Sequence, residues 1–198
     1  MKKDKLLLHT CCAPCAAHVY EVLDRDFNVS AYFYNPNIAP FGEYERRLGE
    51  LVTYSERRKF PLFVGLYDAR DWTMFVKPYR FEGERSERCM RCFLYRLDRT
   101  FRYARDNSFD AVASVMSISP HKNAEMINDA GRRLKKQYGL GFIEADFKKN
   151  DGFRQSVEIS RQQGFYRQTY CGCVYSNQER KKSQNSKISS KKSYYFPA

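Results

Sequence analysis

Short apolar runs alternate with longer amphipathic stretches along most of this chain, and that alternation limits its fold more than any other feature. The apolar runs have the length of buried strands and occupy residues 5–8, 29–34, 61–66, 109–116 and 141–145. The amphipathic stretches have helical spacing and cover residues 16–24, 43–59, 69–77, 89–106, 123–138 and 151–163. Strands that alternate with helices of this length form βαβ units. The sequence therefore predicts an α/β fold with a parallel sheet flanked by helices.

The chain has the length of one domain with a tail. Its 198 residues are 42% hydrophobic, which excludes a disordered chain. From Lys181 onward the sequence holds five lysines, five serines and no acidic residue. We therefore expect a single folded domain at residues 1–180 and a flexible, basic Lys/Ser-rich tail at residues 181–198. The net charge of +12 favours a polyanionic partner, although the tail by itself is equally well explained as a solvated terminus.

The start of the sequence lacks the features of a secretory signal. Its apolar run at residues 6–8 spans three residues, whereas a signal-peptide core has about 7–15. No stretch approaches the roughly 18 apolar residues of a membrane helix. We therefore expect a cytoplasmic protein with no membrane partner. In that compartment, clustered cysteines serve more often as metal ligands or catalytic groups than as disulfides.

Seven cysteines fall into three tight clusters, and the first cluster directly follows the first predicted strand. This cluster contains Cys11, Cys12 and Cys15, and it lies where an open α/β sheet binds its ligands. A strand-to-helix turn lets the sulfurs of Cys11 and Cys12 face one site, and Pro14 suits the first turn of the following helix. Cys15 should then lie near a helix N-terminus, where the helix dipole lowers the pKa of a thiol.

The second cluster is a pair at the start of a predicted helix. Cys89 and Cys92 are three residues apart and share one helix face, which suits chelation. Arg85, Arg88 and Arg91 surround the pair and could offset the negative charge of thiolates.

The third cluster, Cys171-Gly172-Cys173, places two cysteines near the limit of the separation that a disulfide accepts. Bridging them needs a tight turn, which Gly172 permits. Strained disulfides in small rings are easily reduced. The spacing therefore favours a dithiol that switches between oxidised and reduced forms.

Two kinds of metal site fit these spacings. A zinc ion could bind Cys12, Cys15, Cys89 and Cys92, since sites with four cysteines are common. Such a site would leave the other three cysteines without a role, and its two pairs are much further apart than in a zinc ribbon. An iron–sulfur cluster with a separate redox or metal-binding set uses every cysteine. The pattern favours iron–sulfur, with zinc as the alternative.

Seven motifs in this order resemble the QueH family of epoxyqueuosine reductases, and they spread over nearly the whole body of the chain. The combination of HTCCAPC, RCMRC and YCGC is specific, whereas YNPNI or DFKK alone would be weak. The motifs are HTCCAPC (9–15), YNPNI (34–38), EYER (43–46), RCMRC (88–92), SISPHK (117–122), DFKK (146–149) and YRQTYCGCVYS (166–176).

The resemblance implies a HUP-type, Rossmann-like fold and a cobalamin-independent oxidoreductase. The implied reaction reduces epoxyqueuosine to queuosine at the wobble position of tRNA, the last step of queuosine biosynthesis. It makes residues 1–180 an iron–sulfur reductase domain. It also implies that a [4Fe-4S] cluster binds Cys11, Cys12, Cys89 and Cys92, and that Cys171 and Cys173 form the redox-active pair. Cys15 is left over, either as an auxiliary group or as a ligand of an additional iron.

The implied partners are the anticodon arm of tRNA and an unidentified electron donor. To reach a pocket, the wobble base has to leave its stack. Candidate phosphate contacts are Arg46, Arg47, Lys122, Lys148 and Lys149. Other candidates for nucleoside or tRNA contact are Tyr34, Asn35, Asn37, Tyr166, Gln168 and Tyr170. Candidate proton donors, chosen by residue type only, are Asp146, His121 and Tyr170.

Two other functions remain open at this point. An iron–sulfur-dependent tRNA thiolation enzyme would share the α/β layout, but it would need ATP. The sequence holds neither a G-x-G-x-x-G nor a G-K-[ST] phosphate loop, which argues against ordinary use of ATP or NAD. A zinc-stabilised RNA-binding module would account for the positive charge alone.

Overall fold

The computed structural model describes residues 2–192 of the chain. Its strands are β1 (Lys5–Thr10), β2 (Asn28–Phe33), β3 (Leu62–Val64), β4 (Ala111–Ser114) and β5 (Gly141–Phe142). Its helices are α1 (Ala13–Leu23), α2 (Phe41–Arg58), α3 (Ala69–Val76), α4 (Glu87–Asp106), α5 (Ala124–Tyr138), α6 (Gly152–Gln162) and α7 (Val174–Lys192), with short 3₁₀ turns η1 (Lys77–Tyr79) and η2 (Val115–Ile118). The predicted alternation of strands and helices is confirmed.

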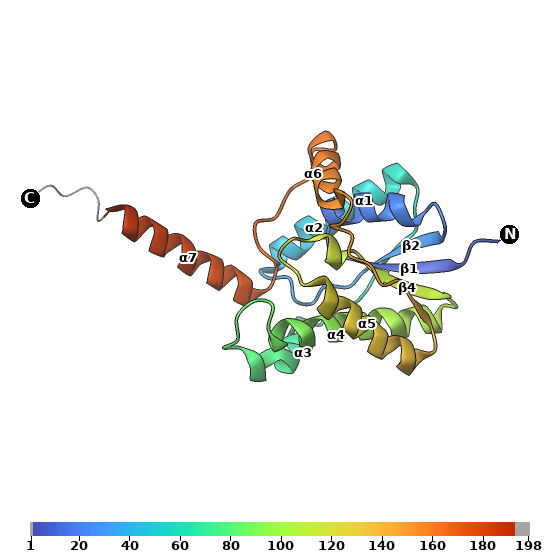
Figure 1. Ribbon diagram of the computed structural model, residues 1–198, viewed down its shortest axis with the longest axis horizontal. Helices are drawn as coiled ribbons and strands as arrows, with labels where there is room; N and C mark the ends of the chain where they lie inside the picture. The colour runs from blue at the N-terminus through green and yellow to red at the C-terminus, as the bar shows by residue number, and fades with distance from the viewer. Residues whose placement is uncertain (1, 193–198) are drawn as a thin grey trace, which may run out of the picture.

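The five strands form one parallel sheet in the order β3-β2-β1-β4-β5. This order places β1 at the centre and makes the fold doubly wound, so the predicted α/β class is confirmed. Helices cover both faces, with α1 and α6 packed together on one face and α4 and α5 on the other (Figure 1). Because all strands run the same way, the cysteine cluster that follows β1 lies at the carboxyl edge of the sheet.

Strand β1 is apolar because both of its faces are covered. Leu6, Leu7 and Leu8 are fully buried. The side chains of Leu6 and Leu8 pack on the α1 side, whereas Leu7 packs on the α4 side against residues such as Phe101. A strand of a parallel sheet that helices cover on both faces must be apolar at successive positions. The sequence of β1 therefore shows a continuous apolar run rather than alternation.

The fourth strand ends earlier than its apolar pattern predicts. Residues up to Met116 were expected in the strand, but β4 ends at Ser114 and the chain turns into η2. The Ser114 hydroxyl accepts a hydrogen bond from the Met116 amide at 3.2 Å and also bonds the His9 ring at 3.0 Å. This capping hydroxyl ends the strand at Ser114. Val115 and Met116 remain buried, so the apolar run in the sequence extends beyond the strand.

The segment after Lys181 also differs from expectation, because α7 continues to Lys192 rather than ending in an irregular tail. No glycine or proline occurs within α7, and lysine, arginine, glutamine and glutamate are good helix formers. Figure 1 shows α7 pointing away from the body of the domain. The rest of the predicted tail, residues 193–198, lies outside the described residues.

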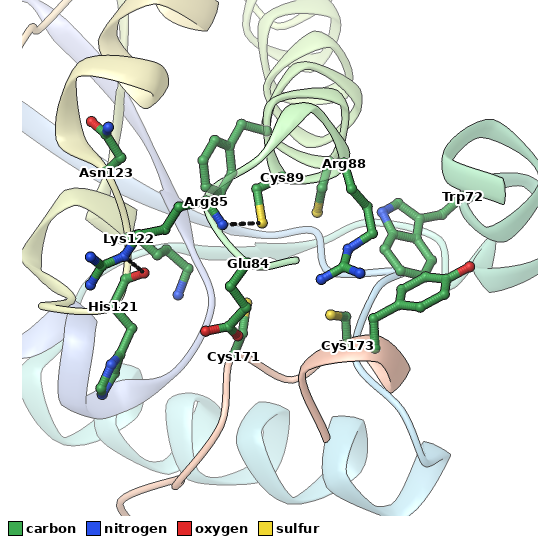
Figure 2. Close-up of a pocket in the computed structure, with 13 residues that line it drawn as sticks. Trp72, Glu84, Arg85, Arg88, Cys89, His121, Lys122, Asn123, Cys171 and Cys173 are labelled. Carbon is green, nitrogen blue, oxygen red and sulfur yellow. Dashed lines mark hydrogen bonds between the residues drawn. The ribbon is translucent and has the colours of Figure 1, made fainter. Parts of the chain in front are cut away.

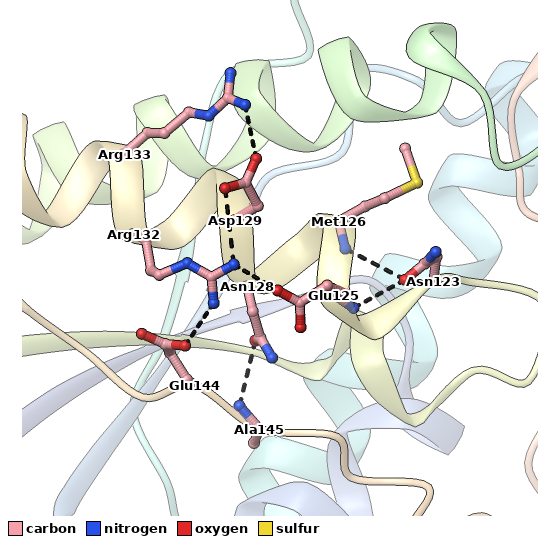
Figure 3. A network of polar contacts seen from close by, with 9 residues as sticks. All are labelled: Asn123, Glu125, Met126, Asn128, Asp129, Arg132, Arg133, Glu144 and Ala145. Carbon is pink, nitrogen blue, oxygen red and sulfur yellow. Dashed lines mark hydrogen bonds and ion pairs between the residues drawn. The ribbon is translucent and has the colours of Figure 1, made fainter.

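A network of polar contacts fixes the loop after β5 against α5 (Figure 3). The Asn123 side chain caps α5 by accepting the amide of Glu125 at 2.9 Å. The Arg132 guanidinium pairs with Glu144 at 2.8 Å, and Ala145 donates its amide to Asn128. These contacts hold residues 144–149 beside the carboxyl edge of the sheet.

Among the described residues, no helix combines the length and apolar character that a membrane crossing requires.

The fold predicts a large cost for shortening a core leucine of α4. Leu97 is fully buried, so Leu97→Ala should lower the free energy of unfolding by about 2–5 kcal/mol in a urea titration. Leu66 is 84% exposed, so the matched control Leu66→Ala should change it by less than about 0.5 kcal/mol. Equal effects of the two variants would contradict the packing described here.

Candidate metal and redox site

Each of the three cysteine motifs stands at the N-terminus of a helix. Cys12 is the N-cap residue of α1, Cys89 lies in the first turn of α4, and Cys173 immediately precedes α7. The amide of Ser176 donates a hydrogen bond to the Cys173 sulfur at 3.4 Å, as to an N-cap side chain. The positive ends of three helix dipoles therefore face sulfur atoms, which favours thiolates and other anions.

The first cluster forms a compact group of three sulfurs. The sulfurs of Cys11 and Cys12 are 3.8 Å apart, and those of Cys11, Cys12 and Cys15 all lie within 4.8 Å of one another. The strand-to-helix turn thus brings neighbouring cysteines to one site, as predicted. A tetrahedral ion with metal–sulfur bonds of about 2.3 Å needs sulfurs about this far apart. These three residues could hold a metal ion.

Hydrogen bonds among the three thiols shift their pKa values in opposite directions. The thiols of Cys12 and Cys15 donate to Cys11 and hold the pKa of Cys11 well below its usual range. The same bonds raise the pKa of Cys12 to about 12, and they raise the pKa of Cys15 with further help from burial. The prediction of a lowered pKa for Cys15 is therefore wrong, because loss of its proton would remove a hydrogen bond in a buried site.

Sulfurs from the other two clusters line a second space. Cys89, Cys92, Cys171 and Cys173 surround one cavity together with the indole of Trp72 (Figure 2). The Cys89 sulfur accepts the Arg85 amide at 3.3 Å, and burial raises the pKa of Cys89 to about 11. The tertiary structure thus joins two motifs that are about eighty residues apart in the chain.

The three arginines expected around the second cluster have different surroundings. Arg88 is buried, forms a 2.8 Å ion pair with Glu179 of α7 and lies over the Tyr175 ring. Arg85 donates to backbone carbonyls at 120 and 121. Arg91 is partly exposed and pairs with Glu87. Arg88 and Arg85 line the cysteine cavity, but Arg91 does not.

The loop that carries Cys171 and Cys173 is held by its backbone. The Arg47 guanidinium donates to the Cys171 carbonyl at 3.2 Å, and the Ala39 amide donates to the Gly172 carbonyl at 2.9 Å. Gly172 has a φ of 117°, and a Cβ there would lie 2.9 Å from Arg47 Nη1. Only glycine fits this turn without displacing a neighbour. Both cysteines are free thiols in this structure.

Arg47 was predicted to contact tRNA phosphates, and this prediction is wrong. Its side chain is 1% exposed and forms an ion pair with Glu43 at 2.6 Å. A guanidinium in this position cannot reach a phosphate on the surface. Its role in the structure is to bind the cysteine loop.

Three candidates for nucleoside contact, Tyr34, Asn35 and Asn37, are interior residues. All three are at most 2% exposed. The Tyr34 hydroxyl donates to both carboxylate oxygens of Asp68 at 2.8 Å. Sequence periodicity could not reveal that these residues are buried, because they lie at the end of a strand and in the loop after it. Helices α3 and α4, which come later in the chain, cover that loop. Tyr34 therefore offers no stacking surface to a base.

Other candidate contact residues are bound by neighbouring groups. The Gln168 amide donates to the Cys12 sulfur at 3.0 Å. Arg46 stacks on the Tyr166 ring at 3.6 Å. The Tyr170 hydroxyl, a candidate proton donor, donates its hydrogen to the Ala39 carbonyl at 2.7 Å.

Lys122 stands between the two groups of sulfurs. Together with His121 and Cys171, it lines both the cysteine cavity and a second cavity that includes Cys15 and Gln168. Like Arg47, it is a predicted phosphate contact that the structure places beside the cysteines. Asp146 and Lys148, which pair at 2.8 Å, lie along an adjoining groove that also includes Lys122 and Lys149.

Two buried N–H groups test whether this site suits an iron–sulfur group. Trp72 Nε1 and Arg96 Nε have no hydrogen-bond partner among the described residues. Trp72 packs directly on Cys92, and Arg96 lies one helical turn after it. Sulfur atoms of a bound cluster are acceptors for such donors, so the residues present fit the group. The sequence assigns no functional role to either residue; for Arg96 the available signal is its i+4 spacing from Cys92.

Comparisons with known proteins agree with this arrangement. A model of the family "Epoxyqueuosine reductase QueH" matches residues 6–179, a span that contains every cysteine. The chain belongs to the QueH family. It is 41% identical over 175 residues to the epoxyqueuosine reductase QueH of Acinetobacter baylyi, covering 87% of this chain and 80% of that one. It is 35% identical over 193 residues to that of Thermotoga maritima, covering 96% and 98%.

The QueH of Streptococcus pyogenes is 40% identical over 181 residues, covering 87% of this chain and 70% of that protein. Among solved structures, a predicted subunit of a tRNA methyltransferase from Methanocaldococcus jannaschii has a TM-score of 0.50 at 9% identity, covering 84% of this chain and 93% of that chain. That likeness concerns the fold alone. The predicted membership of an oxidoreductase family and its Rossmann-like fold are confirmed.

The close contact at Gly172 yields a stability prediction. Gly172→Ala should lower the free energy of unfolding by about 1–3 kcal/mol, because the new Cβ meets Arg47 and alanine disfavours a positive φ. The change is read from the midpoint of a urea titration of the reduced protein.

Gly42 is the matched control, since it lies in α2 and a Cβ there meets nothing within 4 Å. Gly42→Ala should be neutral or stabilising by up to about 1 kcal/mol. An unchanged midpoint for Gly172→Ala would contradict the described turn.

Proposed function

We propose that this protein is an epoxyqueuosine reductase that converts epoxyqueuosine to queuosine at the wobble position of tRNA. The observation that carries the proposal is the family match over residues 6–179, a span that contains all seven cysteines. Five of them line two adjoining cavities, and Cys11 and Cys12 form a group of three sulfurs with Cys15. Opening of the epoxide to an alkene and water consumes two electrons and two protons. The site therefore needs a store of electrons and a source of protons.

A [4Fe-4S] cluster held by Cys11, Cys12, Cys89 and Cys92 is the proposed cofactor. Such a cluster supplies single electrons, and an iron with an open position acts as a Lewis acid. Support comes from the convergence of helix N-termini and from the unpaired N–H groups beside Cys92.

Cys171 and Cys173 are the proposed redox pair. Two thiols that become one disulfide release two electrons and two protons, which balances the removal of one oxygen as water. A hydrogen bond from the Cys173 thiol, aided by Lys122, holds the pKa of Cys171 well below its usual range. The resulting disulfide is then reduced by an external electron donor. Both residues line the cavity that contains Cys89 and Cys92.

Cys15 is the proposed ligand of an additional iron or an auxiliary group of the cluster. Its sulfur lies within 4.8 Å of those of Cys11 and Cys12, a spacing that suits one ion. It also lines the cavity shared with Cys171 and Gln168.

The cavity that includes Cys15 is the proposed entry for the modified nucleoside. Its walls combine apolar and polar groups, including Phe153, Arg167 and Tyr170. A wobble base that has left its stack could place its ring next to Cys171 and Lys122. The adjoining groove with Lys148 and Lys149 is the proposed path of the phosphate backbone, and tRNA and the reduced thiols together favour a cytoplasmic location.

The reaction itself is the first test. Protein purified without oxygen should contain about four irons per chain for one cluster, plus any additional iron, and should convert epoxyqueuosine-containing tRNA to queuosine with dithionite as electron source. Nucleoside mass analysis measures the product. Cys171→Ser and Cys173→Ser should abolish multiple turnovers yet keep the iron, and Thr53→Ala, which removes an exposed hydroxyl of α2, serves as the control.

Colourless protein that binds one zinc and forms no queuosine would overturn the proposal in favour of an RNA-binding module. Formation of a thiolated nucleoside from ATP and a sulfur donor would instead favour a thiolation enzyme.

The ligand assignment makes a separate prediction. Cys89→Ser should lose most of the iron and the absorbance of the cluster, whereas Cys15→Ser should keep about four irons. Iron and sulfide analysis of the purified variants measures this. The reverse pattern would show that the set is Cys11, Cys12 and Cys15 with another group.

The phosphate path predicts a change in the salt dependence of tRNA binding. Lys149 is exposed along the groove, so Lys149→Ala should weaken binding several-fold and reduce the slope of log Kd against log salt by about one. Filter binding at several salt concentrations measures the slope. Lys136→Ala removes the same charge from the far end of α5 and should leave it unchanged.

A further inference from the structure

Arg96 is a buried cation without an acidic partner. Its side chain is 1% exposed, and no carboxylate lies within ion-pair distance of it among residues 2–192. The other buried arginines of the site each have one, because Arg47 pairs with Glu43 and Arg88 pairs with Glu179. A guanidinium does not lose its proton, so its charge must be offset by other anions.

The anions within reach of Arg96 are thiolates. Arg96 follows Cys92 by four residues in α4, so the two side chains leave the same face of the helix. Cys92 is buried and lines the same cavity as Cys171, so this part of α4 faces cysteines of two motifs.

A chain of hydrogen bonds also ties Arg96 to the end of β1. Arg96 Nη2 donates to Asn35 Oδ1 at 2.5 Å, and Asn35 Nδ2 donates to the Thr10 carbonyl at 2.8 Å. Thr10 immediately precedes Cys11, and all three residues of the chain are at most 1% exposed. The helix that carries Cys92 is thus fastened to the strand that delivers Cys11.

One donor of Arg96 is left over. Arg96 Nε is buried and has no partner among the described residues, although Nη2 is bound to Asn35. Buried N–H groups are nearly always paired in folded proteins. The remaining donor fits a sulfur acceptor in the filled site.

We propose that Arg96 is a positioning residue that holds Cys92 and Cys11 at the spacing of one metal site and supplies the positive charge that this site needs. Filling the site adds negative charge, because a divalent ion that binds three or four thiolates replaces as many protons. Reduction of a cluster adds a further negative charge. Loss of Arg96 therefore disfavours both steps. The second step rests on the proposed function, whereas the first depends only on the cysteines.

Three variants separate charge from geometry. Arg96→Met removes the charge at similar volume, Arg96→Lys keeps the charge but loses the planar fork, and Asn35→Ala cuts the tie to Thr10 while keeping Arg96. Arg102→Met is the control, since Arg102 lies on α4, is half-exposed and pairs only with Asp98. Thermal unfolding of each full-length variant identifies those that do not fold.

The first measurement is the titration of the reduced, metal-free protein with Co²⁺, followed by sulfur-to-cobalt absorption. Arg96→Met should weaken Co²⁺ binding at least tenfold, Asn35→Ala should weaken it and alter the absorption bands, and Arg96→Lys should recover part of the affinity. Unchanged affinity in a folded Arg96→Met protein would overturn the proposal. If Arg96→Met does not fold, the result for Asn35→Ala decides in the same way.

The second measurement is the midpoint potential of the iron-loaded protein. Arg96→Met should disfavour the reduced form at least tenfold, which for one electron is a shift of about 59 mV to lower potential. Arg102→Met should not shift it. A wild-type protein that assembles no cluster would overturn the proposed function, while the Co²⁺ titration would still decide the role of Arg96.

Discussion

Burial of β1 on both faces is the constraint on which the site depends. Because Leu6, Leu7 and Leu8 pack under helices of opposite layers, the strand cannot slide without exposing apolar surface. Its carboxyl end therefore delivers Cys11 and Cys12 to a fixed place at the edge of the sheet. The N-termini of α4 and α7 reach the same edge from elsewhere in the chain, and each brings its own cysteines.

Electrostatics explains why so many thiols can share this interior. Arg47, Arg96 and Lys122 lie near the cysteines, and among the described residues the acidic partner of these cations is Glu43, which pairs with Arg47. Together with three helix N-termini, this leaves a surplus of positive charge in a buried region, which would be unfavourable without bound anions. Thiolates, and the proposed cluster when bound, would neutralise that charge. The fold, the site and the proposed reduction thus depend on one another through the same charges.

The loop of Cys171 and Cys173 is the part of the site in which backbone conformation matters most. Its carbonyls are bound by Arg47 and by the Ala39 amide, and Gly172 takes a conformation that other residues rarely adopt. A dithiol that exchanges electrons benefits from such a support, because the two sulfurs stay close to Cys89 and Cys92 in the cavity that they share. Arg88 and Glu179 join the start of α7 to α4 beside it.

The sequence by itself determined the fold class and the family. The strand and helix periods and the three cysteine motifs depend only on the spacing of nearby residues, so they can be recognised in the sequence alone. Only the tertiary structure decided that Tyr34 and Arg47 are interior groups, that β4 ends at Ser114, and that Arg96 faces the sulfurs. Side chains of one type look the same in a sequence whether they face solvent or a neighbour. Burial and charge pairing arise between distant segments, so they are fixed only when the sheet brings those segments together.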